Sequence, residues 1–103
     1  MPEMTFRVRW PDGSQTDCYS PSLVMHDHLS AGSSYPLPEF LRRTHTALGI
    51  ASDRVRAKYG RPCAMAAAQL REIDLRAAPF ASVGGEVEVL SMQPELPDSS
   101  GAI

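Results

Sequence analysis

Apolar and polar residues alternate at the start of the chain. Large apolar side chains occupy every second position of residues 4–10, and polar ones occupy most positions between them. This period of two predicts a β-strand with one buried face. Residues 11–13 (Pro-Asp-Gly) then supply turn chemistry, so we expect a hairpin. The expected cross-strand pairs are Trp10 with Ser14, Val8 with Thr16, Arg7 with Asp17 and Phe6 with Cys18.

The segment after the hairpin carries a weaker pattern. Ser20 before Pro21 is typical of a helix N-cap followed by the favoured first helical position, which predicts a short helix over residues 20–29. The alternative is an irregular extension of the second strand. In both cases residues 30–34 (SAGSS) are expected to form a flexible loop.

The longest periodic segment covers residues 40–59. Its apolar positions recur at steps of three and four residues, which predicts an amphipathic helix of about five to six turns. Gly60 suits the left-handed cap, and Pro62 can open a second, antiparallel helix that stops before Pro79. The expected apolar stripe of the long helix consists of Phe40, Leu41, Thr44, Ala47, Leu48, Ala51, Val55 and Tyr59.

Residues 86–90 (EVEVL) alternate again and predict a third strand. If its valines face the helices, Glu86 and Glu88 face solvent on the same side as Arg7 and Arg9. Placing this strand beside the first one brings opposite charges together, so we expect the strand order 2-1-3.

These elements together predict an α+β fold with the order β-β-(short α)-α-α-β. A three-stranded sheet would carry the helix pair on one face. We assign residues 1–92 to a single domain. Residues 93–103 contain proline, serine and glycine and little that could be buried, so we expect a disordered C-terminal tail.

Length and charge restrict the function. A chain of 103 residues has room for one domain, which excludes a multidomain enzyme. The formal charge of -2 and a pI near 5.8 provide no global positive field for nucleic acid or an anionic membrane. The first residues lack a secretory signal, so we expect a cytoplasmic protein without a membrane segment. Cys18 and Cys63 are interpreted as free thiols.

Two sets of residues are candidates for chemistry. His26 and His28 could ligate a metal, but neither a CxxC pair nor an HExxH spacing accompanies them. We interpret them as loop histidines and predict neither a metal nor a cofactor.

Cys63 is expected in the first turn of the second helix, where unpaired N–H groups favour a thiolate. No histidine base is close in sequence, so we favour a small buried thiol at the helix entrance and keep a reactive thiolate as the alternative.

A locally basic stretch runs through residues 42–61. It lacks the signature of a helix-turn-helix, an RNP motif or a zinc finger, so we favour a solvated helix face or an acidic protein partner over nucleic acid. Ile50 lies roughly opposite the core stripe, where the second helix covers it or it is an exposed contact, for example of a homodimer. The predicted partner-binding residues are Arg43, Ile50, Arg54, Arg56 and Lys58.

Several motifs together resemble a small bacterial family of nitrogen starvation response proteins. They are residues 10–13 (WPDG), 18–22 (CYSPS), 35–37 (YPL) and especially 47–63 (ALGIASDRVRAKYGRPC). The resemblance covers about residues 1–92. Its members are typically encoded beside a nitrilase and other enzymes, which implies a shared pathway and a partner from the same gene cluster. It implies no catalytic residues.

We therefore expect a small, non-catalytic accessory or regulatory protein of a nitrogen starvation response, acting through protein or small-metabolite binding. The alternative is a small enzyme or enzyme subunit that uses Cys63, with a histidine from the segment containing His26 and His28. An open pocket that holds Cys63 beside a histidine would favour the enzyme.

Overall fold

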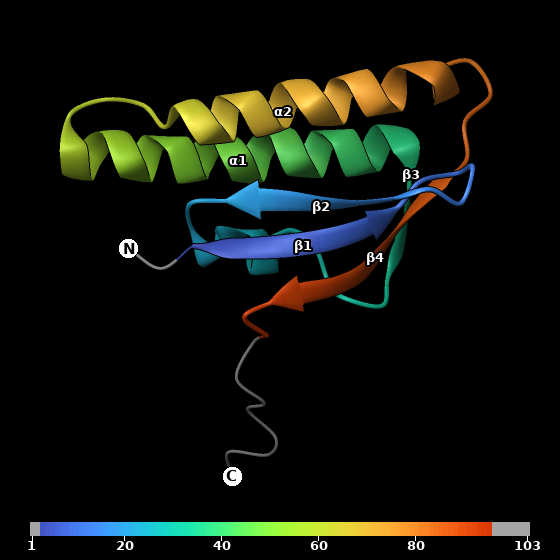
Figure 1. Ribbon diagram of the computed structural model, residues 1–103, viewed down its shortest axis with the longest axis horizontal. Coiled ribbons are helices and arrows are strands. Elements are labelled where there is room, and N and C mark those ends of the chain that lie inside the picture. Colours follow the sequence, from blue (N-terminus) through green and yellow to red (C-terminus); the bar gives the residue numbers. More distant parts are fainter. Residues whose placement is uncertain (1–2, 96–103) are drawn as a thin grey trace, which may run out of the picture.

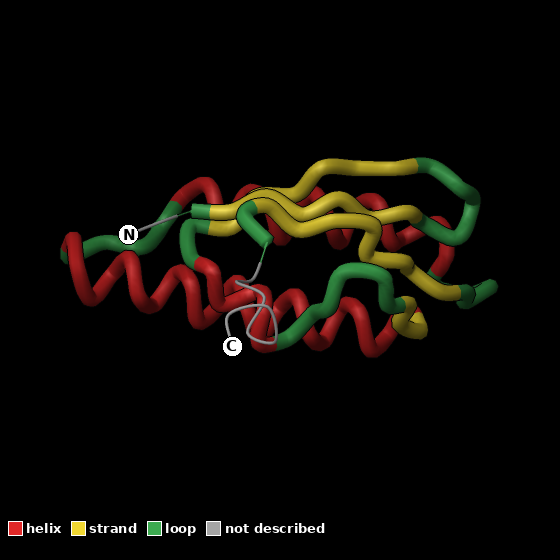
Figure 2. The backbone as a smooth tube through the Cα atoms, turned by 90° about the horizontal axis from the view of Figure 1, so that it is seen from below, coloured by secondary structure: helices red, strands yellow, loops and turns green. Residues whose placement is uncertain are grey.

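A four-stranded antiparallel sheet packs against two long helices in the computed structural model, which describes residues 3–95 (Figure 1). From below, the sheet is seen as one layer with the helices beneath and behind it (Figure 2). The α+β class expected from the sequence is thus confirmed. The elements are β1 (Met4–Arg9), β2 (Gln15–Ser20), η1 (Leu23–Asp27), β3 (Ser34–Pro36), α1 (Leu37–Tyr59), α2 (Ala64–Ala77), η2 (Ala78–Phe80) and β4 (Glu86–Gln93).

The hairpin of β1 and β2 forms in the predicted register. Phe6 lies opposite Cys18, and Arg7 opposite Asp17. The Trp10 N–H donates to the Ser14 carbonyl at 2.8 Å, which closes the turn. Gly13 has a φ of 88°, a left-handed conformation that favours glycine. Local turn chemistry therefore sets the pairing of the two strands.

The sheet has four strands in the order β2-β1-β4-β3, so the prediction of three strands is wrong. The order of the three predicted strands is correct, and Arg9 forms an ion pair with Glu88. The additional strand begins in the stretch expected to be a loop, where Ser34 pairs with Glu88 and Pro36 with Glu86. Three residues are too few to show a period of two in the sequence. Only the pairing with β4 therefore identifies this segment as a strand.

The short helix is present as the 3-10 helix η1, but the prediction of Ser20 as its N-cap is wrong. Ser20 belongs to β2, where it pairs with Met4. Ser22 is the N-cap, and its side chain accepts a hydrogen bond from the Val24 N–H at 3.3 Å. The sheet ladder continues through Ser20, and this pairing excludes the helix start that the Ser-Pro pair indicated.

Both long helices form where the periodicity predicts them. Gly60 ends α1 with a φ of 83°, and its N–H donates to the Arg56 carbonyl at 2.8 Å. The apolar stripe is buried from Phe40 to Ala51 except for the half-buried Leu41, but Tyr59 is 60% exposed. This end of α1 projects beyond the strands in Figure 1, so no sheet covers it.

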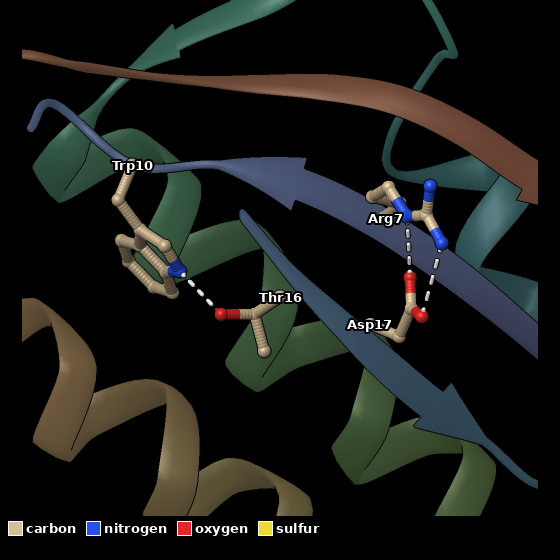
Figure 3. A network of polar contacts seen from close by, with 4 residues as sticks. All are labelled: Arg7, Trp10, Thr16 and Asp17. Atoms are coloured by element: carbon tan, nitrogen blue, oxygen red, sulfur yellow. Dashed lines mark hydrogen bonds and ion pairs between the residues drawn. The ribbon is translucent and has the colours of Figure 1, made fainter. Parts of the chain in front are cut away.

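A single core joins all layers of the fold. The Trp10 ring packs edge-on against Phe40 of α1, with ring centroids 5.7 Å apart, and stacks on Phe80 of η2 at 6.5 Å. Its indole N–H donates to the Thr16 hydroxyl at 3.1 Å, while Arg7 and Asp17 pair on the solvent side of the hairpin (Figure 3). The core therefore connects both ends of the described chain.

The predicted domain boundary lies at the end of β4. This strand continues to Gln93, one residue beyond the expected limit of 92. The predicted disordered tail, residues 93–103, lies outside the described residues from position 96 onward.

Candidate functional site

A pocket of about 220 Å³ opens at the end of the molecule where α1 meets α2. We call it the Cys63 pocket. Segments from five places in the sequence converge on it: the start of the described chain, β2, the segment after β2, the last turns of α1 and the start of α2. Its lining residues are Glu3, Tyr19, Pro21, Val55, Tyr59 and Cys63.

Tyr19 is the best-positioned polar group of the pocket. Its hydroxyl donates to Glu3 Oε2 at 3.3 Å, and its backbone N–H donates to Gln69 Oε1 at 2.9 Å. Burial and then the carboxylate of Glu3 raise the pKa of the Tyr19 phenol. The phenol therefore remains a hydrogen-bond donor at neutral pH, and α2 holds its backbone in place through Gln69.

Cys63 lines the pocket as the N-cap of α2, so the prediction that it lies in the first turn is wrong by one residue, because the helix begins at Ala64. Its backbone carbonyl accepts from the Ala67 N–H at 3.2 Å, and its side chain makes no capping hydrogen bond. No histidine is among the described residues that line the pocket. The pocket thus presents a half-buried thiol without the imidazole base that a cysteine nucleophile ordinarily uses.

Cys18 has a different environment. It is 1% exposed in the core beside β1, and burial raises the pKa of its thiol to about 12. A thiol that stays protonated and enclosed is a packing residue.

Three exposed cations lie in and just after the last turns of α1, whose Val55 and Tyr59 line the Cys63 pocket. Arg56, Lys58 and Arg61 are exposed, and none of them forms an ion pair with a described residue. The Lys58 ammonium lies 5.6 Å from the ring centroid of Tyr59. We call these three side chains the cationic end of α1, a surface that fits an anionic partner.

Two of the predicted partner-binding arginines bind their own chain. Arg43 donates to the His28 carbonyl at 2.9 Å, pairs with Glu39 and lies 4.9 Å from the Tyr35 ring centroid. Arg54 donates to the Ser22 hydroxyl at 3.0 Å. These contacts attach the two ends of η1 to α1.

Ile50 lies on the same flank of α1 as these two arginines, and it is half-buried. On a helix of 3.6 residues per turn, it is about 140° from His45, which hydrogen-bonds Asp74 of α2 at 2.8 Å. The structure therefore places Ile50 on the η1 side, and coverage by the second helix is ruled out.

The two histidines that were considered as metal ligands, His26 and His28, make separate contacts. His26 Nε2 lies 2.9 Å from the Pro94 carbonyl oxygen, beside a hollow of about 260 Å³. The backbone of His28 accepts from Arg43. Within residues 3–95, no group of three or more His, Cys, Asp or Glu side chains gathers in a metal-binding arrangement.

The sequence did not identify Glu3 and Tyr19 as neighbours of Cys63, nor Gln69 as the partner of Tyr19. Tyr19 pairs with Thr5 in the hairpin register, two positions from Glu3, and this register was the one signal that Glu3 and Tyr19 approach each other. The contact between β2 and Gln69 of α2 spans 50 positions in the sequence and depends on tertiary packing.

Comparison with known proteins gives one result. The family model described as nitrogen starvation-induced protein NitG matches residues 5–92. No curated protein and no solved structure matches the chain. The described helices include none that is long and apolar enough to cross a membrane. The match supports the nitrogen starvation family expected from the motifs, while the nitrilase gene cluster stays a prediction.

Proposed function

The chain belongs to the family of the nitrogen starvation-induced protein NitG, and from this membership we propose that it is a non-catalytic accessory or regulatory protein. It binds an acidic segment of a partner protein at the cationic end of α1. The proposed setting is the cytoplasm, and the partner is the product of a gene in the same cluster. This proposal rests above all on three exposed cations without described ion-pair partners, in a chain with a net charge of -2.

The arrangement of charges supports a protein partner. Arg56 and Lys58 lie in the last turn of α1 and Arg61 just after it, and the same turn carries the 60% exposed ring of Tyr59, which lines the Cys63 pocket. Aromatic and cationic side chains around a small pocket are typical of binding surfaces on which an acidic segment gains both charge and apolar contact.

Lys58→Glu tests this proposal. Affinity capture from nitrogen-starved cells would be followed by titration of the captured protein against the purified chain. We expect the reversal to weaken binding about tenfold or more, because it replaces attraction by repulsion. Arg42→Glu is the matched control, since Arg42 is also exposed on α1 and the change in net charge is identical.

Equal weakening by both variants would contradict a localised surface. Titration with a single-stranded and a duplex oligonucleotide addresses nucleic-acid binding. A steep loss of oligonucleotide affinity with salt, reduced in the Lys58→Glu variant, would replace the protein partner by nucleic acid.

A second candidate function is a small enzyme or enzyme subunit that uses Cys63. The observation in its favour is that the thiol lines an open pocket beside Tyr19. An activated thiol would react with iodoacetamide at pH 7 at least about tenfold faster than free cysteine, and Cys63→Ala would abolish that reaction. Alkylation at the rate of free cysteine would reject the enzyme.

A further inference from the structure

The outer face of α2 exposes large apolar side chains. Leu75 is 74% exposed and Met65 is 60% exposed, whereas Ile73, on the opposite side of the helix, is 1% exposed. Val83, just after η2, is 76% exposed. Among the described residues, Leu75 and Val83 are the most exposed large hydrophobic side chains, so this face offers apolar surface that the fold leaves uncovered.

Two opposite charges lie on one side of Leu75. Glu72 and Arg76 are both exposed, and neither forms an ion pair with a described residue. They lie on the same side of Leu75, at about 60° and 100° around the helix axis. One edge of the face therefore carries one acid and one base, four positions apart.

We propose that the outer face of α2 binds a second copy of this chain. The two α2 helices run antiparallel, with a two-fold axis close to Leu75. Leu75 then packs near Leu75 of the other copy, and each Glu72 lies beside Arg76 of the other copy. The interface is isologous, since the same patch supplies both sides of the contact.

Charge complementarity selects a second copy as the occupant. In an antiparallel pair, a two-fold axis normal to the plane that contains both helix axes places each edge of one α2 against the same edge of the other α2. Two residues that lie equally far from this axis along the helix, on opposite sides of it, then come level with each other across the interface. The midpoint of Glu72 and Arg76 is position 74, one residue before Leu75 on the same helix. One axis beside Leu75 thus joins the acid with the base and brings the two Leu75 side chains together.

The small side chains of α2 allow the two helices to approach closely. Ala68 is exposed one turn before Glu72 on this face. A helix with alanine at such a position permits a short interaxial distance, within the usual range of about 8–10 Å. This surface lies outside the cationic end of α1, so the inference does not depend on the proposed function.

Sedimentation equilibrium from micromolar to millimolar concentrations tests the proposal on the full chain. We expect a dimer whose dissociation constant rises about a hundredfold or more in Leu75→Asp, because a charge would be buried at the axis. Circular dichroism of the same variant should show an intact fold, since Leu75 is exposed in the single chain. Lys58→Glu should leave the dimer unchanged.

Charge exchange separates a specific contact from general stickiness. Glu72→Arg alone should weaken the dimer about tenfold, because two ion pairs are replaced by repulsion. Combining it with Arg76→Glu should restore the wild-type constant. A chain that is monomeric at all concentrations, or a dimer that Leu75→Asp leaves intact and Ile50→Asp disrupts, would overturn the proposal.

Discussion

Phe6 and Arg9 lie in the same strand but in opposite environments. Phe6 is 1% exposed and packs in the core, whereas the side chain of Arg9 is 46% exposed and pairs with Glu88. The alternation of β1 decides this difference, because successive side chains of a strand point to opposite faces. Residues close in sequence therefore contribute very differently to stability.

Replacing Phe6 with alanine should lower the free energy of unfolding by about 3 to 5 kcal/mol, since it removes buried ring atoms and leaves a cavity. Arg9→Ala should cost about 1 kcal/mol or less, because an exposed ion pair is weak. Urea unfolding of the two variants measures both values. A reversed ranking would show that the assignment of the strand faces is wrong.

The buried thiol of Cys18 should make stability depend on alkaline pH. Burial raises its pKa from 9.0 to about 12. Above about pH 9, the unfolded chain loses a proton that the folded chain retains, so stability is fully present below this pH and decreases toward pH 12. The expected extra slope is about 1.4 kcal/mol per pH unit.

Urea unfolding between pH 8 and pH 10.5 measures this slope for the wild type and for Cys18→Ala. The variant lacks the titrating thiol and keeps the tyrosines, so the difference between the two slopes isolates Cys18. Identical slopes would contradict the raised pKa.

At the scale of the elements, α1 has two different flanks. One flank contacts α2, where His45 hydrogen-bonds Asp74. The other flank holds η1 through Arg43 and Arg54, and Ile50 lies between these two arginines. Residues that the sequence suggested for partner binding thus stabilise the position of η1 within the chain.

Ile50→Asp should therefore lower the free energy of unfolding by about 1 to 3 kcal/mol, because a charge enters a half-buried apolar position. Thr46→Asp is the control, since Thr46 lies one turn earlier and is exposed. Thermal melting of the two variants gives the comparison. Equal melting temperatures would indicate that Ile50 lies free on the surface.

At the scale of the whole molecule, a single tryptophan contacts both the sheet and the helical layer. Trp10 contacts α1 through Phe40 and η2 through Phe80, and it hydrogen-bonds Thr16 of β2. No second core of buried hydrophobic side chains is present in residues 3–95. A single connected core favours cooperative unfolding.

Fluorescence of Trp10 and far-ultraviolet circular dichroism should therefore give coincident denaturant transitions. The first signal follows packing around one side chain, and the second follows all helices and strands. A fluorescence transition that precedes the loss of helix would indicate that the helix pair unfolds separately from the sheet.

Local chemistry in the sequence determined much of this fold. The alternation of residues 4–10, the Pro-Asp-Gly turn and the three- and four-residue periodicity of α1 each depend on neighbours within a few positions. The hairpin register and the C-terminal end of α1 could therefore be predicted, whereas α1 begins at Leu37, three residues before the predicted start. The place of β4 beside β1 followed instead from the opposite charges of the two strands. The motifs also indicated the nitrogen starvation family that the match over residues 5–92 supports.

Only the tertiary structure decided the features that depend on distant contacts. Strand β3 exists because Ser34 and Pro36 pair with β4, and three residues carry no periodic signal. Ser20 loses its capping role because the ladder with Met4 continues through it. Cys63 meets Tyr19 and Glu3 because α2 packs beside β2, where Gln69 holds the edge strand. Such contacts join segments far apart in the chain, and the free energy of packing that selects them is absent from any local pattern.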